Sequence, residues 1–232
     1  MKTAIMQPYF LPYLGYFQLI AAVDLFIIYD NIQYTKSGWI NRNRIYGNGE
    51  AVTISIPLKS ASDYLDVCER ELAADFRRDK LLNKIRSAYL KAPYFAQTFP
   101  LIEAIVRYDE TNLFRFLEHC VRRTCDHLGV TTQIRVSSSI AIDHGLKKQE
   151  KVLALCDAVG ASVYVNAIGG LELYRADEFL DRGVELKFIR TKPFEYQQYG
   201  NAFVPMLSII DVLMFNSIPA IQALITGGYE LI

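Results

Sequence analysis

The feature that most constrains the fold is the apolar run 25–29, which is followed directly by the carboxylate of Asp30. Its side chains are aliphatic or aromatic and do not alternate with polar ones, a pattern typical of a strand buried on both faces. Such strands belong to parallel sheets that helices cover. Because ligands of open α/β sheets bind beyond the carboxyl ends of the strands, the run predicts that Asp30 lies at a binding edge.

A strand and a helix precede this run. Residues 2–6 are expected to form a short strand, and the segment 7–17 contains two prolines and a glycine that fix a shaped loop opening a helix through about Ala22. Strand, loop, helix and strand are the start of a parallel βαβ unit. The same alternation returns later, with expected strands at 131–136, 162–166 and 184–190 and helices at 148–159, 176–181, 207–215 and 219–225.

Between these two parts lies a helical block at 74–128, where apolar residues recur at helical spacing in three stretches. A turn with hairpin chemistry at 46–50 and a strand at 51–58 come before it. The sequence therefore predicts an α/β fold with a mainly parallel sheet flanked by helices. We expect one domain over 1–232, with 74–128 as an inserted helical block or subdomain.

Composition excludes several classes of protein. The 232 residues are 51% hydrophobic, and 25 Lys and Arg balance 25 Asp and Glu, so no broad positive field is expected to hold nucleic acid. No apolar stretch has the length of a membrane span, and no signal-peptide core is visible. The four cysteines form no CxxC pair. Buried free thiols in a cytoplasmic protein are expected, with disulfides or metal ligation as the alternatives.

Polar side chains crowd the segment that follows Asp30. Arg42 and Arg44 are two residues apart, so in an extended chain they share a face and can converge on one anion, with Asn41 and Asn43 on the other face. A solvated or salt-bridged loop is the alternative. The remaining polar residues of this segment are Asn31, Gln33, Lys36 and Trp39.

Two of these residues have specific alternatives. Trp39 is the only tryptophan, and its flat ring either stacks on a base or sugar or anchors the core. Asp30 is either a general base, or a group that binds a hydroxyl or ammonium, or a turn-forming residue.

A second corner of strand and loop occurs at 166–174. The pair Gly169 and Gly170 can present backbone N–H groups to an oxyanion, although a tight turn explains the pair as well. The three histidines show no metal-ligand spacing, and nucleophile, GxGxxG and Walker signatures are absent. We therefore expect no metal and no other cofactor.

Several blocks of the chain resemble the WbqC-like family, which is associated with bacterial O-antigen and related surface-polysaccharide gene clusters. They are QPYFLPYLGYF, YDNIQYTKSGWINRNRI, NAIGGLELY, FVPMLSIIDVLMFNS and YELI, and the resemblance spans nearly the whole chain. It implies an enzyme of lipopolysaccharide sugar modification that transfers an acyl or aminoacyl group to the amine of a nucleotide-linked amino sugar. Many members carry His before Gln-Pro, whereas Met6 stands here.

The resemblance also implies roles for residues. Asp30 is the candidate base, and Gln7, Asn166 and the amides of Gly169 and Gly170 are candidate oxyanion donors. The donor would be a thioester or an acyl or aminoacyl carrier protein. Substrate binding is assigned to Tyr13, Gln33, Lys36, Trp39, Asn41, Arg42, Asn43 and Arg44. The alternatives are a glycosyltransferase, although no DxD-type metal site is present, and a noncatalytic scaffold protein of the polysaccharide machinery.

Overall fold

A six-stranded sheet forms the centre of the computed structural model, which describes residues 1–200 and 202–232. Neighbouring strands are parallel except for the last pair, which is antiparallel. The sheet confirms the predicted α/β class. Its order is β5 (Gln133–Val136), β2 (Leu25–Ile28), β1 (Lys2–Met6), β6 (Val163–Ala167), β7 (Glu185–Thr191) and β8 (Tyr229–Leu231).

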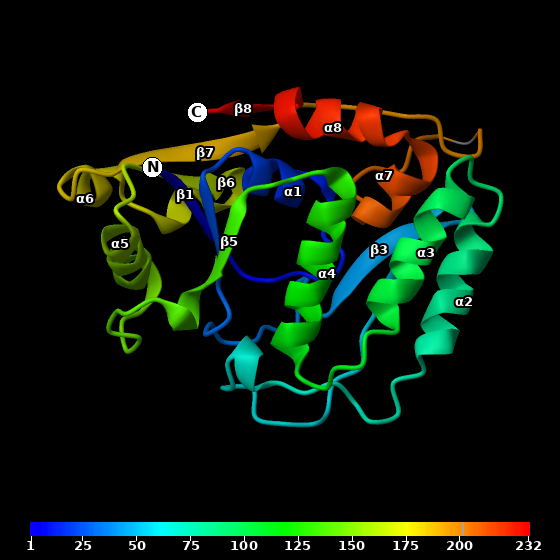
Figure 1. The fold of residues 1–232 in the computed structure, drawn as a ribbon, viewed down its shortest axis with the longest axis horizontal. Coiled ribbons are helices and arrows are strands. Elements are labelled where there is room, and N and C mark those ends of the chain that lie inside the picture. The colour runs from blue at the N-terminus through cyan, green and yellow to red at the C-terminus, as the bar shows by residue number, and fades with distance from the viewer. Residues whose placement is uncertain (201) are drawn as a thin grey trace.

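Helices cover both faces of this sheet (Figure 1). Successive side chains of a strand point to opposite faces, so Leu25 and Ile27 join one apolar cluster, whereas Phe26 and Ile28 join the other. This explains why the run 25–29 is apolar throughout. The first cluster includes residues of α5 (Lys148–Val159) and α6 (Ala176–Leu180), and the second those of α1 (Leu14–Ala21), α4 (Leu113–Leu128) and α8 (Ile218–Gly227).

The second cluster continues away from the sheet into a hairpin and three more helices (Figure 1). The hairpin turns at Asn48 and Gly49, which both have positive φ, the conformation that a two-residue type I′ turn requires. Whether the predicted block 74–128 is a subdomain stays a prediction. These elements are β3 (Arg42–Gly47), β4 (Glu50–Ser55), α2 (Arg78–Tyr89), α3 (Phe95–Val106) and α7 (Ile209–Phe215).

Two strands were not predicted as such. β8 has three residues, too few for a periodic pattern, and it depends on its pairing with β7. β3 begins with Arg42, Asn43 and Arg44, whose polarity indicates a loop, but it pairs with β4 over six residues. None of the described helices has the length and apolar character needed to cross a membrane.

The order of the strands places a crevice at the centre of the sheet. From β1 the chain proceeds to β2 and β5 on one side and later to β6, β7 and β8 on the other. The carboxyl ends of β1 and β6 therefore flank the point at which the winding direction reverses, the usual position of ligands in open α/β sheets.

Candidate functional site

A cavity of about 320 Å³ opens at this reversal point. Four residues that the sequence predicted as site residues meet in its wall, namely Gln7, Asn166, Gly169 and Gly170. Gln7 follows β1, Asn166 belongs to the carboxyl end of β6, and the two glycines follow β6, as expected for groups at the carboxyl ends of neighbouring parallel strands. The wall also contains aromatic rings that the sequence analysis did not select, those of Tyr9, Tyr29 and Tyr174.

Gln7 and Tyr9 form a hydrogen-bonded pair in this wall. Gln7 Nε2 donates to the Tyr9 hydroxyl oxygen at 2.6 Å, and the backbone carbonyl of Gln7 accepts from the Tyr16 hydroxyl at 3.1 Å. Burial raises the pKa of Tyr9 above its ordinary value of 10.0, so this phenol keeps its proton at neutral pH. Because its oxygen already accepts from Gln7, the Tyr9 O–H remains a donor toward a ligand.

Asn166 is held in a fixed orientation on the opposite side of the cavity. Its side chain is 5% exposed, and Oδ1 accepts from the backbone N–H of Ala167 at 2.8 Å. Gly170 packs so closely that a Cβ at this position would overlap Asn166 Nδ2, whereas a Cβ at Gly169 would meet nothing within 4 Å. The glycine pair therefore has two different roles, since only Gly170 gives the amide of Asn166 its space.

A smaller cavity of about 150 Å³ shares the Tyr9 ring with the first one. Four predicted binding residues form its wall, namely Tyr13, Trp39, Arg44 and the buried Asn43. Trp39 is 41% exposed, so the ring is available for stacking and is not a core anchor. The smaller cavity therefore places the predicted aromatic and cationic groups beside the main cavity, which is lined by amides.

Arg44 is the cation of the smaller cavity. Its guanidinium carbon lies 5.2 Å from the centre of the Trp39 ring, and Nη2 donates to the carbonyl of Met206 at 3.2 Å. Arg44 Nε is buried and has no hydrogen-bond partner among the described residues. This atom is closed off from solvent, so an anionic ligand in the cavity would bind the other N–H groups of the guanidinium.

The Arg42 side chain contacts the loop before β3 and not a cavity. Its Nε donates to the carbonyl of Gly38 at 2.9 Å, and Arg42 does not belong to the wall of either cavity. The alternation of β3 places Arg42 and Arg44 on the same face, but only Arg44 reaches the smaller cavity. Convergence of the two arginines on one anion stays a prediction.

The two asparagines of this segment bind backbone groups of the protein itself. Asn41 Nδ2 donates to the carbonyl of Ile56 at 2.8 Å. Asn43 Nδ2 donates to the carbonyls of Phe10 and Leu11 at 3.0 and 2.8 Å, and thereby fastens the loop after β1 to β3. Buried carbonyls need such donors, which explains the polarity of this strand without a ligand.

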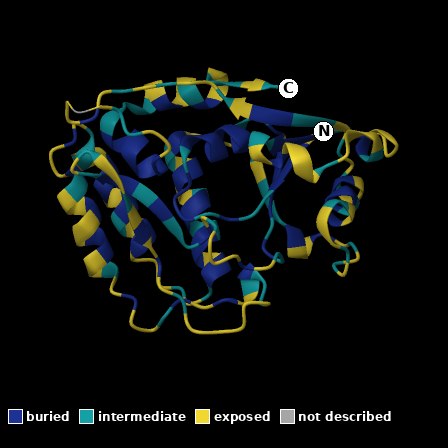
Figure 2. Cartoon of the chain, turned by 180° about the vertical axis from the view of Figure 1, so that it is seen from behind, coloured by how far each residue is buried: buried dark blue, intermediate teal, exposed yellow. Residues whose placement is uncertain are grey.

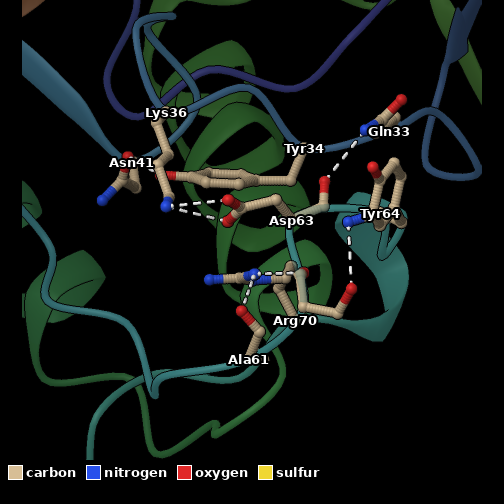
Figure 3. Close-up of polar contacts among 9 residues, drawn as sticks. Gln33, Tyr34, Lys36, Asn41, Ala61, Asp63, Tyr64 and Arg70 are labelled. Atoms are coloured by element: carbon tan, nitrogen blue, oxygen red, sulfur yellow. Dashed lines mark hydrogen bonds and ion pairs between the residues drawn. The ribbon is translucent and has the colours of Figure 1, made fainter.

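Gln33 and Lys36 contact a neighbouring loop (Figure 3). Gln33 Nε2 donates to the carbonyl of Asp63 at 2.9 Å, and Lys36 Nζ lies 2.9 Å from the Asp63 carboxylate. Behind them the Arg70 guanidinium lies 4.7 Å from the centre of the Tyr34 ring. Neither Gln33 nor Lys36 belongs to the wall of the two cavities, and their predicted role in substrate binding stays a prediction.

Asp30 is 2% exposed and lies behind the main cavity. Its Oδ1 accepts from the Ser137 hydroxyl at 2.7 Å and from the backbone N–H of Ser138 at 3.0 Å, which ties the end of β2 to the end of β5. Its neighbours Tyr29 and Ile32 do form the cavity wall. This geometry suits a residue that positions the wall, and a role for Asp30 as base stays a prediction.

Lys151 is a buried cation that the sequence analysis missed. Its Nζ donates to the carbonyl of Asn31 at 3.0 Å and lies 5.1 Å from the centre of the Tyr29 ring. Burial lowers the pKa of Lys151 and raises the pKa of Tyr29 to about 12. In the sequence Lys151 follows the polar run 147–150 and precedes the apolar residues 152–155, so no local pattern distinguished it from the surface lysines beside it. No group of three or more metal-ligating side chains forms within residues 1–200 and 202–232.

A protein-family model and a relative both match nearly the whole length of this chain. A model of the WbqC-like protein family matches residues 7–223, a range that contains all the predicted site residues. An uncharacterized protein of Mycobacterium tuberculosis is 29% identical over 219 residues, which cover 93% of this chain and 93% of that protein. No solved structure matches the chain.

Proposed function

Because this chain belongs to the WbqC-like protein family, we propose that it transfers an acyl or aminoacyl group to the amine of a nucleotide-linked amino sugar. The setting would be the cytoplasmic assembly of a bacterial surface polysaccharide such as O-antigen. The observation that carries the proposal is the pair of cavities that share Tyr9, one lined by neutral amides and phenols and the other by Trp39 and Arg44. A nucleotide sugar has two matching parts, a sugar with neutral polar groups for the first cavity and a nucleotide with a flat base and charged phosphates for the second.

The nucleotide would occupy the smaller cavity. The Arg44 guanidinium would bind a phosphate oxygen, and the exposed face of Trp39 would stack on a flat ring. Tyr13 closes the cavity, and Gly15 allows it to do so, because a Cβ at Gly15 would overlap the Tyr13 ring.

The amino sugar would then lie in the main cavity, past the shared Tyr9 ring. Its amine nitrogen attacks the carbonyl carbon of the thioester, so an N–C bond forms and the carbonyl becomes a tetrahedral oxyanion. The Tyr9 hydroxyl and the Asn166 amide are donors that can stabilise this oxyanion, with Gln7 fixing the orientation of Tyr9.

Collapse of the oxyanion breaks the C–S bond and releases the thiolate. The nitrogen loses one proton and the thiolate gains one, so the overall reaction needs no net proton and no cofactor. Tyr9 stays protonated throughout because burial raises its pKa. In this scheme Asp30 positions the wall at Tyr29 and Ile32 through its bonds to the Ser137 segment.

The test incubates the purified protein with nucleotide-linked 3-amino and 4-amino sugars and acyl thioesters, followed by mass spectrometry. We expect a mass increase on the sugar nucleotide equal to the acyl group. Tyr9→Phe should lower kcat about tenfold or more, since removing one oxyanion donor commonly costs ~2 kcal/mol or more. Tyr94→Phe, a matched change at the amino end of α3 and outside both cavities, should leave kcat unchanged.

Other outcomes would refute the proposal. Release of the nucleotide with transfer of the sugar would indicate a glycosyltransferase. Binding of the sugar nucleotide without any product, across a panel of acyl donors, would indicate a noncatalytic protein of the same machinery.

A further inference from the structure

Two open grooves lie along α2, apart from the candidate site. One has a volume of about 510 Å³ and runs between the β3–β4 hairpin and the carboxyl end of α2. The other has a volume of about 360 Å³ and runs between β4 and the amino end of α2. Lys84 belongs to the walls of both, so the grooves form one continuous surface, which we call the α2 surface.

The α2 surface is positively charged in a chain with no net charge. Its walls contain Arg77, Lys80, Lys84 and Lys91, against one carboxylate, that of Asp75. None of these four cations has an ion-pair partner among the described residues.

The acidic residue of α2, Asp79, forms its ion pair on the side of the helix that faces α3. Asp79 pairs with Arg107 of α3 at 2.8 Å, and Arg107 also pairs with Glu103. The outer side of α2 is lined by exposed residues, as Figure 2 shows in yellow. The fold therefore neutralises one side of α2 and leaves the cations of the other side facing solvent.

The cations are spread along the length of α2. Arg77 directly precedes the helix, Lys84 lies within it and Lys91 follows its carboxyl end, at intervals of seven residues, or roughly 10 Å where the chain is helical. The neighbouring Leu90 is 59% exposed and adds an apolar contact at the carboxyl end. Cations at this interval match a second helix that carries carboxylates at the same interval.

An added strand is a poorer match for this surface. In a two-residue hairpin, Thr53 of β4 directs its carbonyl away from β3, toward the open edge of the hairpin. Lys84 Nζ donates to that carbonyl at 2.8 Å and so occupies the edge that an incoming strand would need.

We propose that the α2 surface docks an acidic helix of a carrier protein that brings the acyl group as a thioester. This inference rests on the proposed acyl transfer and adds the identity of the donor. The cations recognise the carboxylates of the carrier by charge complementarity, which acts chiefly on the rate and affinity of association. β3 connects the two regions directly, because Arg44 belongs to the small cavity and Tyr46 to the groove.

The experiment compares one acyl group on two donors, an acyl carrier protein and N-acetylcysteamine. The test variant is Arg77→Glu/Lys80→Glu/Lys91→Glu, which keeps Lys84 because that side chain bonds to β4. The control variant is Arg115→Glu/Arg123→Glu/Lys192→Glu, with three charge reversals at exposed positions outside both grooves.

We expect the test variant to raise KM for the carrier-bound donor about tenfold or more and to leave kcat and KM for N-acetylcysteamine thioester unchanged. The control variant should behave like the wild type with both donors. Equal effects on both donors, or no effect on either, would overturn the inference while the acyl transfer itself stands.

If neither donor reacts, the proposed function is refuted. The docking inference is then tested by direct binding of the carrier. Fluorescence anisotropy of the labelled carrier should then give a Kd about tenfold weaker for the test variant than for the control at low ionic strength. No binding to the wild type, or preferential binding of a duplex RNA of matched length, would overturn the docking inference.

Discussion

The main cavity and the polar segment 30–44 contain similar side chains but use them differently. In the cavity wall, the Tyr9 hydroxyl accepts from Gln7 and so keeps its own O–H for a ligand, and the Asn166 side chain is fixed through its oxygen and not through its N–H groups. In the segment 30–44, Asn41 and Asn43 donate to backbone carbonyls of the protein. The first region is built by loops after two parallel strands, whereas the second is a strand and its connection that must be fastened to the loop after β1.

The number of polar residues in a segment therefore does not identify a binding site. Buried backbone carbonyls without a partner are costly, so a strand that crosses a loop recruits amides to satisfy them. A donor that is available to a ligand needs a place in a cavity wall and no acceptor within the protein, as expected for the O–H of Tyr9. The following substitutions separate the two uses.

The largest effect is expected from Asn43→Ala. This change removes the side-chain donor of the buried Phe10 carbonyl, whereas the Leu11 carbonyl keeps its hydrogen bond from the Ser208 hydroxyl, so the free energy of unfolding should fall by about 1–3 kcal/mol. Urea denaturation measures the change. Asn83→Ala at an exposed position of α2 is the control and should stay within about 0.5 kcal/mol of the wild type. Wild-type stability in Asn43→Ala would show that the residue is free for a ligand.

A second test uses the two glycines of the cavity. Gly170→Ala places a Cβ against Asn166 Nδ2 and should lower kcat/KM for the amino-sugar substrate about tenfold, equivalent to ~1.4 kcal/mol. Gly169→Ala meets open space and should leave kcat/KM unchanged. The reverse order of the two variants would show that the backbone N–H of Gly169, and not the orientation of Asn166, matters.

The two arginines of β3 provide a third test. Arg44→Ala should weaken the binding of a nucleotide sugar about tenfold by calorimetry, because a charge-assisted hydrogen bond to phosphate contributes about 1.5–3 kcal/mol. Arg42→Ala should change Kd less than about twofold, a difference below ~0.5 kcal/mol. Equal losses for both variants would support the convergence on one anion that the sequence predicts.

The smallest effect concerns pH and Lys151. Burial lowers its pKa below the ordinary 10.5, so folding releases a proton, and the free energy of unfolding rises with pH between the lowered pKa and 10.5. Lys151→Met lacks this proton. Its stability relative to the wild type should therefore be highest near neutral pH and fall as the pH approaches 10.5, as measured by urea denaturation. Lys192→Met at an exposed position should show the same pH dependence as the wild type.

Much of the fold follows from local pattern. The predicted strand 2–6 and helix 148–159 match β1 and α5 at both ends, because periodicity and the glycine stop at Gly160 are contained in the elements themselves. β8 and β3 were missed for a common reason. A strand of three residues, or one whose polar side chains serve other segments, takes its identity from its partners.

The residues of the candidate site likewise divide into those that local pattern predicted and those that it missed. Gln7, Asn166, Gly169 and Gly170 were predictable because they follow strands, and parallel strands end at one edge of the sheet. Tyr9 and Tyr29 were missed because aromatic residues within apolar stretches indicate a core, and Lys151 was missed because it continues the polar run 147–150. Only the packing of α5 against the end of β2 brings Lys151 to Tyr29.

The sequence by itself determined the class of fold, the order of most elements and the edge at which a ligand would bind, since these depend on patterns within short segments. The tertiary structure alone decided which polar groups remain available there. Asn43 and Arg44 are adjacent in the chain and both belong to the wall of the smaller cavity, but the Asn43 amide donates to carbonyls of a crossing loop, whereas the Arg44 guanidinium lies beside the exposed Trp39 ring. That difference depends on segments more than thirty residues apart in the sequence, whose contacts no local pattern contains.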